Sequence, residues 1–329
     1  MRQPVVDPAA DGRVVVLAGG VGGAKLGAGL QALVGAQLSV VVNTGDDLER
    51  HGLAIWPDHD TVLYTLAGLD DRERGWGLRD ETWSASAQLE RLGEETWFRL
   101  GDRDLATHIV RTVRLRTGAR PTTVARELGH ALGVAATILP MTDQPVRTQV
   151  RTDDGWLEFQ EYFVRRRHEP VVREVRFDGI NAARPTPEVL DALETADAIV
   201  VAPSNPYVSV APILTVPGLA DALASRRAQG APVIAISPIV GGRALKGPAD
   251  RMLASLGAEP SALGVARRYA GWLDGFVLDE LDRALETEIA ALGLATLVTD
   301  TVMTDDESRR RLAAETLELA RRLTPVGAQ

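Results

Sequence analysis

The chain has 329 residues, no cysteine and a formal net charge of −9 at pH 7. The lack of cysteine excludes disulfides, thiolate metal sites and a cysteine nucleophile, and the negative charge argues against non-specific binding to nucleic acid. No run approaches the ~20 apolar residues of a membrane span, and the first residues lack an apolar signal region, so we predict a cytoplasmic protein without a membrane partner.

Apolar runs that alternate with helical patterns predict an α/β fold with a Rossmann-like, doubly wound and mostly parallel sheet, covered by helices on both faces. Residues 1–12 contain two prolines and no periodicity, and we interpret them as a loose N-terminal leader. Residues 13–329 are predicted to form a single domain. Between about 140 and 178, the stretches RTQVRT, WLEFQEYFV and VVREVRF alternate apolar and polar residues, which indicates a small β-rich insertion of antiparallel strands.

The first predicted strand, Val14–Ala18, runs into a glycine-rich segment that a helix over Leu26–Val34 follows. This pattern predicts a phosphate site, because glycine lets the backbone approach a ligand and a helix N-terminus attracts negative charge. The expected phosphate-binding residues are Gly20, Gly22, Gly23 and Lys25. The Walker pattern is absent and the dinucleotide fingerprint fits only with altered spacing, so a glycine turn that serves close packing alone stays open.

The second predicted strand, Leu38–Asn43, is followed by two consecutive carboxylates, Asp46 and Asp47. Ligands of open α/β sheets bind at the carboxyl ends of the strands. Two acidic residues in tandem suit a metal, or one ligand and one base. Asp60 is a further candidate metal ligand, although it could equally cap a helix that begins at Thr61.

The polar stretch from Asp70 to Trp97 contains three tryptophans, whose rings could hold an aromatic ligand or pack in the core. His108 lies one turn after Asp104 in a predicted helix, where it either forms a surface pair with that residue or contacts a substrate.

The doubly wound pattern returns with a strand at Ala198–Ala202, followed by Ser204 and Asn205, whose side chains can hydrogen-bond phosphate or ribose. A strand at Pro232–Ser237 leads to a second glycine turn at Gly241 and Gly242, with Lys246 just beyond. The last strands are expected at 275–279 and 295–298, and a polar helix is expected from 306 to about 323.

Several separated motifs give the chain a family resemblance from Val14 to the last helix. They are AGGVGGAKL, NTGDD, PDHDTVLYTL, RGWGLRDETW, WFRLGDRDLATH, VAPSNP and SPIVGG, in this order. Together they resemble the CofD/FbiA family, the 2-phospho-L-lactate or phosphoenolpyruvate transferases of coenzyme F-420 biosynthesis. We expect the transferase alone, without a second, glutamate-adding ligase domain.

The resemblance implies transfer of a phospho-carboxylic acid from a guanosine diphosphate-linked donor to the terminal ribityl hydroxyl of the deazaflavin Fo. GMP is released, Mg²⁺ is required, and the protein is expected to be a homodimer. Asp46 and Asp60 would hold the metal with Asp47 alongside, and these three form the catalytic set. The implied nucleotide and phosphate contacts are Gly20, Gly22, Gly23, Lys25, Ser204, Asn205, Gly241 and Gly242, and the implied deazaflavin contacts are Trp83, Arg103 and His108.

Two other functions stay open on the sequence. A related YvcK-like branch would bind a nucleotide sugar as a regulator without catalysis, and the intact NTGDD and HDTVLYT segments favour the transferase over it. A nicotinamide dehydrogenase would use the first strand, glycine turn and helix. The tandem aspartates and the second nucleotide-type loop at 203–206 weigh against that alternative.

Overall fold

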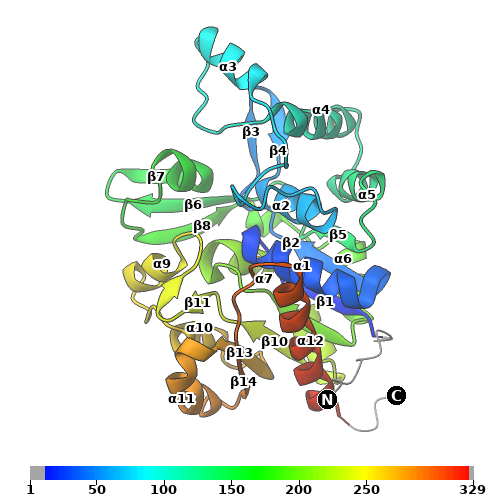
Figure 1. Cartoon of the computed structure of the whole chain (residues 1–329), viewed down its shortest axis with the longest axis vertical. Helices are drawn as coiled ribbons and strands as arrows, with labels where there is room; N and C mark the ends of the chain where they lie inside the picture. The colour runs from blue at the N-terminus through cyan, green and yellow to red at the C-terminus, as the bar shows by residue number, and fades with distance from the viewer. Residues whose placement is uncertain (1–11, 326–329) are drawn as a thin grey trace.

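A computed structural model describes residues 12–325 and has a seven-stranded parallel sheet at its centre, in the order β14-β13-β10-β9-β1-β2-β5 (Figure 1). The strands are β1 (Val14–Ala18), β2 (Leu38–Val42), β5 (Thr137–Pro140), β9 (Ala198–Val201), β10 (Val233–Ile236), β13 (Gly275–Asp279) and β14 (Ala295–Thr299). β1 lies in the middle and pairs with β2 on one side and β9 on the other. The predicted fold class is confirmed.

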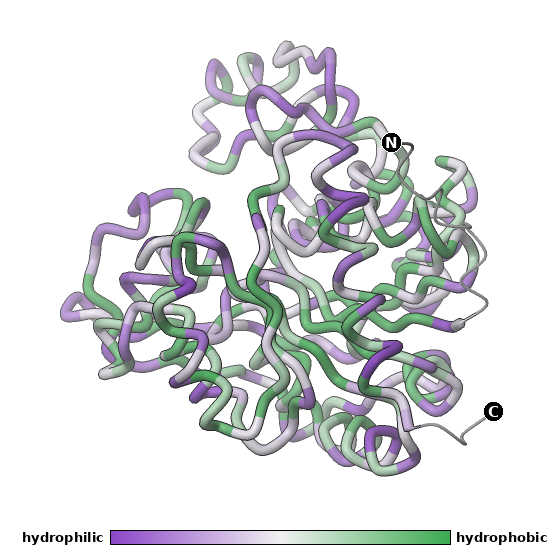
Figure 2. Tube along the Cα trace, turned by 60° about the horizontal axis from the view of Figure 1, so that its bottom comes forward, coloured by the Kyte–Doolittle hydropathy of each residue, from purple (hydrophilic) through white to green (hydrophobic). Residues whose placement is uncertain are grey.

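The sheet is buried on both faces, as its apolar strands predict. Alternate residues of β1 enter opposite layers: Val15 and Leu17 pack on one side, and Val14 and Val16 on the other. One layer contains α1 (Gly20–Val34), α2 (Pro57–Leu66), α5 (Pro121–Ala131) and α12 (Asp306–Leu323). The other contains α6 (Pro187–Glu194), α7 (Ala211–Thr215), α8 (Leu219–Ala228), α9 (Ala249–Ser255), α10 (Ala262–Tyr269) and α11 (Glu286–Ala290). Figure 2 shows apolar residues along the central strands and polar residues around the outer turns.

The predicted antiparallel insertion is present as a three-stranded sheet of β6 (Arg147–Thr152), β7 (Gly155–Glu158) and β8 (Glu174–Asp178). A hairpin of β3 (Leu48–Arg50) and β4 (Leu53–Ile55) lies with α3 (Ser84–Arg91) and α4 (Asp102–Arg116) at one end of the molecule (Figure 1). Residues 1–11 of the predicted leader lie outside the described residues.

Two helices begin earlier than their sequences predict. α1 begins at Gly20 instead of Leu26, so the glycine segment forms its first turns. Packing of α1 between α2 and α12 outweighs the low helix propensity of glycine. α2 begins at Pro57 instead of Thr61, because proline suits the first helical position, where no backbone donor is needed.

Gly241 and Gly242 form the turn of a two-residue hairpin between β11 (Ile239–Val240) and β12 (Arg243–Ala244). Both glycines have positive φ, at 57° and 76°, which this tight turn requires.

Within residues 12–325, no single helix is long and apolar enough to cross a membrane. In this part of the chain, one pair of segments, Pro206–Thr215 and Leu219–Ala228, reaches that length and apolarity when taken together, and it is bent by 83° at its break.

Candidate active site

The glycine turn, residues 19–23, leads from β1 into the first turns of α1. One serine holds it against the loop after β9. The Ser204 hydroxyl donates to the Gly19 carbonyl at 2.8 Å and accepts from the Gly19 amide at 3.3 Å. A side chain at Gly22 would overlap the Pro203 carbonyl, so this glycine is required where α1 meets the loop. The predicted site residues Gly20, Gly22, Gly23 and Ser204 therefore gather at the carboxyl ends of two central strands, and close packing explains part of the glycine pattern.

A buried cluster of two carboxylates and one amide lies beside this turn. The Asn43 side-chain amide, just after β2, donates to Asp46 at 3.1 Å and to Asp58 at 2.8 Å. The Gly20 amide donates to the other Asp58 oxygen at 2.7 Å, which ties the cluster to the first turn of α1. Sequence analysis missed Asp58. The only signal for it was a second acidic residue near the start of a helix.

The surroundings of this pair raise the pKa of both carboxylates. Burial, followed by the nearby charge of Asp58, raises the pKa of Asp46 well above its usual value. Burial also raises the pKa of Asp58 to about 6, against the hydrogen bonds from Asn43 and Gly20. Within residues 12–325, neither carboxylate forms an ion pair with a basic side chain. A divalent cation with oxygen ligands fits this pair, because it would neutralise two buried charges that no protein group balances.

The unbalanced charge leads to a prediction for stability. Because the folded pKa of Asp58 is raised, its contribution is fully present below the unfolded pKa of 3.8 and is lost as the pH rises through about 6. In EDTA, the free energy of unfolding should fall by up to about 3 kcal/mol over that range from this group. Asp46→Asn should be more stable than the wild type in EDTA at pH 8, but not at pH 4. Thermal melts at both pH values measure this, and equal melting curves at pH 8 would contradict it.

Asp47 lines a pocket between residues 45–48 and the three-stranded sheet of β6, β7 and β8. The pocket is lined by Gly45, Asp46, Asp47, Leu48, Arg147, Thr148, Glu158, Phe159 and Gln160. Burial raises the pKa of Asp47 well above its usual value, and the charges of Arg147 and Arg111 oppose that rise. One Asp47 oxygen and the Thr44 and Thr148 hydroxyls are buried and have no hydrogen-bond partner among the described residues. These groups can hydrogen-bond a polar ligand in this pocket.

Asp60 belongs to a different buried network. Its two oxygens accept from the Arg111 guanidinium, one of them at 2.9 Å, and His59 Nδ1 lies 3.1 Å from it. Burial opposes ionisation, yet the positive charge of Arg111 and the hydrogen bond from His59 hold the pKa of Asp60 below its usual value. The alternative in which Asp60 caps a helix is wrong, because α2 begins at Pro57 and Trp56 occupies the cap position.

The metal role of Asp60 stays a prediction. Ligand atoms of Asp60, Asp104 and His108 lie within 4.8 Å of one another, in a geometry that could hold an ion. Arg111 already balances the Asp60 charge, whereas the Asp46 and Asp58 charges have no such partner. The charge balance therefore favours Asp58 over Asp60 as the second carboxylate beside Asp46.

The three predicted deazaflavin contacts have separate surroundings. His108 is 1% exposed and lies 3.2 Å from Asp104, beneath the surface. Arg103 is exposed and donates to the Arg79 carbonyl at 2.7 Å. The half-buried Trp83 ring has the guanidinium groups of Arg74 and Arg99 over it, at 4.9 and 4.4 Å from its centroid, and Trp76 at 5.9 Å.

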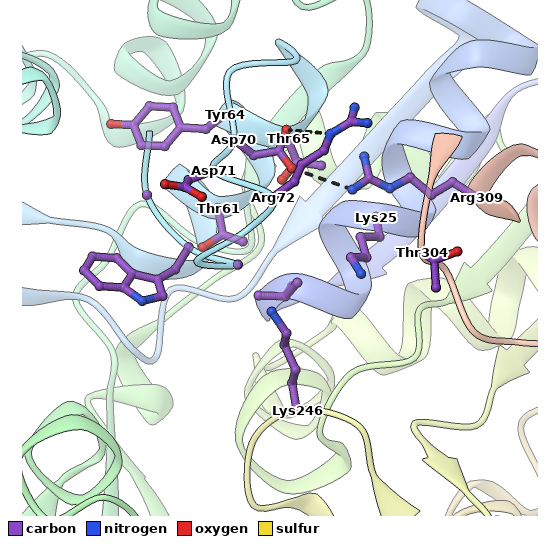
Figure 3. A pocket seen from close by; sticks show the side chains of 14 residues that line it. Lys25, Thr61, Tyr64, Thr65, Asp70, Asp71, Arg72, Lys246, Thr304 and Arg309 are labelled. Atoms are coloured by element: carbon purple, nitrogen blue, oxygen red, sulfur yellow. Dashed lines mark ion pairs between the residues drawn. The ribbon is translucent and has the colours of Figure 1, made fainter. Parts of the chain in front are cut away.

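The remaining predicted nucleotide contacts, Asn205, Gly241 and Lys25, also have different surroundings. Asn205 caps the next turn by accepting from the Tyr207 amide at 2.9 Å, and among residues 12–325 its own amide nitrogen contacts only the Met252 sulfur, at 3.4 Å. That nitrogen is therefore a weakly engaged donor near the glycine turn. The Gly241 amide already donates to Asp282 at 3.0 Å. Lys25 extends from α1 into a pocket beside the turn (Figure 3).

Comparisons with known proteins identify relatives over nearly the whole chain. The family model described as 2-phospho-L-lactate transferase CofD matches residues 14–318. A phosphoenolpyruvate transferase of Streptomyces griseus is 43% identical over 315 residues, which are 94% of this chain and 98% of that protein. A 2-phospho-L-lactate transferase of Methanosarcina mazei is 40% identical over 301 residues, 91% of this chain and 98% of that protein.

Solved structures give the same fold at lower identity. A protein of Bacillus halodurans superposes with a TM-score of 0.61 at 20% identity, over 93% of this chain and 99% of that one. A second structure from the same organism, a member of the UPF0052 family, has a TM-score of 0.58 at 17% identity, over 92% of this chain and 98% of that one. The structural likeness concerns the fold alone, while the family match and the two relatives extend over nearly the whole sequence. The chain belongs to the CofD family of 2-phospho-L-lactate transferases.

Proposed function

We propose that the chain transfers a phospho-carboxylic acid from a guanosine diphosphate-linked donor to the terminal ribityl hydroxyl of the deazaflavin Fo, in the biosynthesis of coenzyme F-420. The observation that carries this proposal is the Asp46–Asp58 pair beside the glycine turn, two buried carboxylates that have no cationic partner in the described part of the chain. Such a pair suits Mg²⁺ beside a diphosphate. When bound, Mg²⁺ would supply positive charge next to the phosphate oxygens.

Three residues of the chain have different proposed roles in the transfer. The ribityl oxygen forms a bond to the phosphorus that carries the acid, and the bond from that phosphorus to GMP breaks, with GMP keeping the electron pair. Asp47 accepts the hydroxyl proton, since its raised pKa makes it a better base than an ordinary carboxylate. The Asn205 amide donates to the donor nucleotide. Trp83 stays a proposed deazaflavin contact.

The test measures GMP and the mass of the product in the presence of Fo, Mg²⁺ and one donor at a time. The donors carry 2-phospholactate, phosphoenolpyruvate or phosphoglycerate, because the two named relatives differ in their acid at nearly equal identity. GMP release should require Fo and stop in EDTA. No GMP with any donor would contradict the transferase. Binding of UDP-N-acetylglucosamine by that same inactive protein would support a nucleotide-sugar-binding regulator instead.

Asn205→Ala should raise the KM for the donor about tenfold or more and leave the KM for Fo nearly unchanged. A hydrogen bond to a charged group is worth roughly 1.5–3 kcal/mol, and its loss acts on the bound nucleotide. The matched variant Asn205→Asp keeps the oxygen that accepts from the Tyr207 amide but loses the donor. It should raise the KM for the donor at least as much, because it also places a negative charge beside an anionic nucleotide, but without the loss of stability of about 1 kcal/mol expected for the missing cap. A fall in Fo affinity would contradict this assignment.

A further inference from the structure

Both lysines of the chain line one pocket, between α1, α2, the loop 70–77 and the start of α12 (Figure 3). The chain has 36 lysines and arginines, of which only Lys25 and Lys246 are lysines. Lys25 comes from α1 and Lys246 from the segment after β12, so residues 221 positions apart point into the same space. A lysine ammonium is a compact charge with three donors, which suits a small anionic group.

The acidic residues of this pocket already have arginine partners. Asp70 lies 3.6 Å from Arg309 and 3.9 Å from Arg72, and Asp71 lies 3.3 Å from Arg74. Within residues 12–325, neither lysine lies within 4 Å of a carboxylate, and the Lys25 ammonium donates to the Met303 carbonyl at 2.6 Å. Burial, then the charges of Arg309 and Lys246, lower the pKa of Lys25. The pocket therefore carries an excess of positive charge that an anion would neutralise.

The backbone around Lys246 leaves room for its ammonium group. Gly75 in the loop 70–77 has a φ of 78°, and a side chain there would overlap the Lys246 Nζ. Any other residue at position 75 would be strained and would also displace the lysine. The loop and the lysine thus fit each other, and the second positive charge is kept beside the first.

The pocket adjoins the proposed transfer site. Val21, next to the Gly20 amide that binds Asp58, lines it, and so does Thr61, one turn after Asp58 on α2. Lys25 lies five residues beyond Gly20, which is about 7.5 Å along the helix. An anion between the lysines would therefore lie farther along α1 than a diphosphate at the glycine turn. Lactate, enolpyruvate and glycerate all present a carboxylate at the far end of the transferred group.

We propose that Lys25 and Lys246 bind the carboxylate of the transferred phospho-acid and so select donors that carry an acid. This inference rests on the proposed function. Both lysines act on the group that all three candidate acids share, so they would distinguish an acid donor from a simple nucleoside diphosphate. The same positive charge would also attract the diphosphate of the donor. The binding experiment below distinguishes contact with the diphosphate from contact with the carboxylate.

The test is calorimetric binding of two ligands, GDP and the phospholactate donor, with Mg²⁺ present. Lys246→Met is the chosen variant because Lys246 is exposed and has no hydrogen bond to lose among the described residues. It should weaken donor binding about tenfold and leave GDP binding within twofold. Arg243→Met, an exposed residue of the adjoining strand, is the matched control and should change neither. A donor with a carboxamide in place of the carboxylate should bind the wild type and Lys246→Met equally.

The other outcomes overturn the proposal in distinguishable ways. An equal loss of donor and GDP binding would place the diphosphate between the lysines. Unchanged binding of both ligands to Lys246→Met would remove Lys246 from the site. A wild type that binds neither ligand and releases no GMP would refute the proposed function itself, whereas an active wild type with an unaffected variant would refute only the lysine assignment.

Discussion

Asp46→Asn should lower kcat by about 10³-fold in the presence of Fo, donor and Mg²⁺. The substitution keeps an oxygen that accepts from Asn43, so the cluster retains its hydrogen bond, but one of the two charges that would hold Mg²⁺ is gone. Metal stabilisation of transition-state charge is worth several kcal/mol, and about 4 kcal/mol corresponds to that loss of rate. Steady-state rates measured over a series of Mg²⁺ concentrations should also show a higher half-saturating concentration.

Asp58→Asn should cause a similar loss, but it is the less selective variant. An asparagine at this position can accept from only one of the Gly20 and Asn43 donors, so the glycine turn is disturbed as well. Asp221→Asn, on the exposed side of α8, is the control and should leave the rate unchanged. Fo binding should survive in all three variants. An Asp46→Asn enzyme with near-normal turnover and an unaltered Mg²⁺ requirement would exclude Asp46 as a metal ligand.

Arg111→Met should lower the free energy of unfolding by about 3–5 kcal/mol, the effect of removing one partner of a buried ion pair. The Arg111 side chain is fully buried, donates to both Asp60 oxygens and lies over the Trp56 ring at 4.4 Å from its centroid. Its loss leaves the Asp60 charge without a partner and removes packing against tryptophan. Urea unfolding at pH 7 measures the change, and a variant as stable as the wild type would contradict it.

A double variant separates charge from packing. Arg111→Met combined with Asp60→Asn should be more stable than Arg111→Met alone, because no uncompensated charge remains. The pKa of Asp60 is held below its usual value, so the ion pair stabilises the fold above about pH 4 and this stabilisation is lost at more acid pH. The loss of unfolding free energy caused by Arg111→Met should therefore be smaller at acid pH than at pH 7. Asp60→Asn should keep the wild-type half-saturating Mg²⁺ concentration, and a higher concentration would restore Asp60 as a metal ligand.

Much of the fold could be predicted from local sequence. Short runs of valine, leucine and isoleucine have few alternatives to buried strands, so β1, β2, β9 and β10 were predicted within a residue or two. The alternation of apolar and polar residues identified the antiparallel insertion for the same reason. Helix starts were less predictable, because glycine and proline disfavour helix interiors in general but are accommodated in the first turns of α1 and α2.

The sequence by itself determined that acidic residues follow β2 and that glycines follow β1, since chain order places them at the strand ends. Only the tertiary structure decided which carboxylates share a site. Asp58 and Asp60 are two positions apart, so their side chains point about 200° apart around α2. Packing of α2 directs Asp58 to Gly20 and Asn43, and Asp60 to Arg111 on α4. These partners lie between 15 and 51 residues away in sequence, beyond the reach of any local pattern.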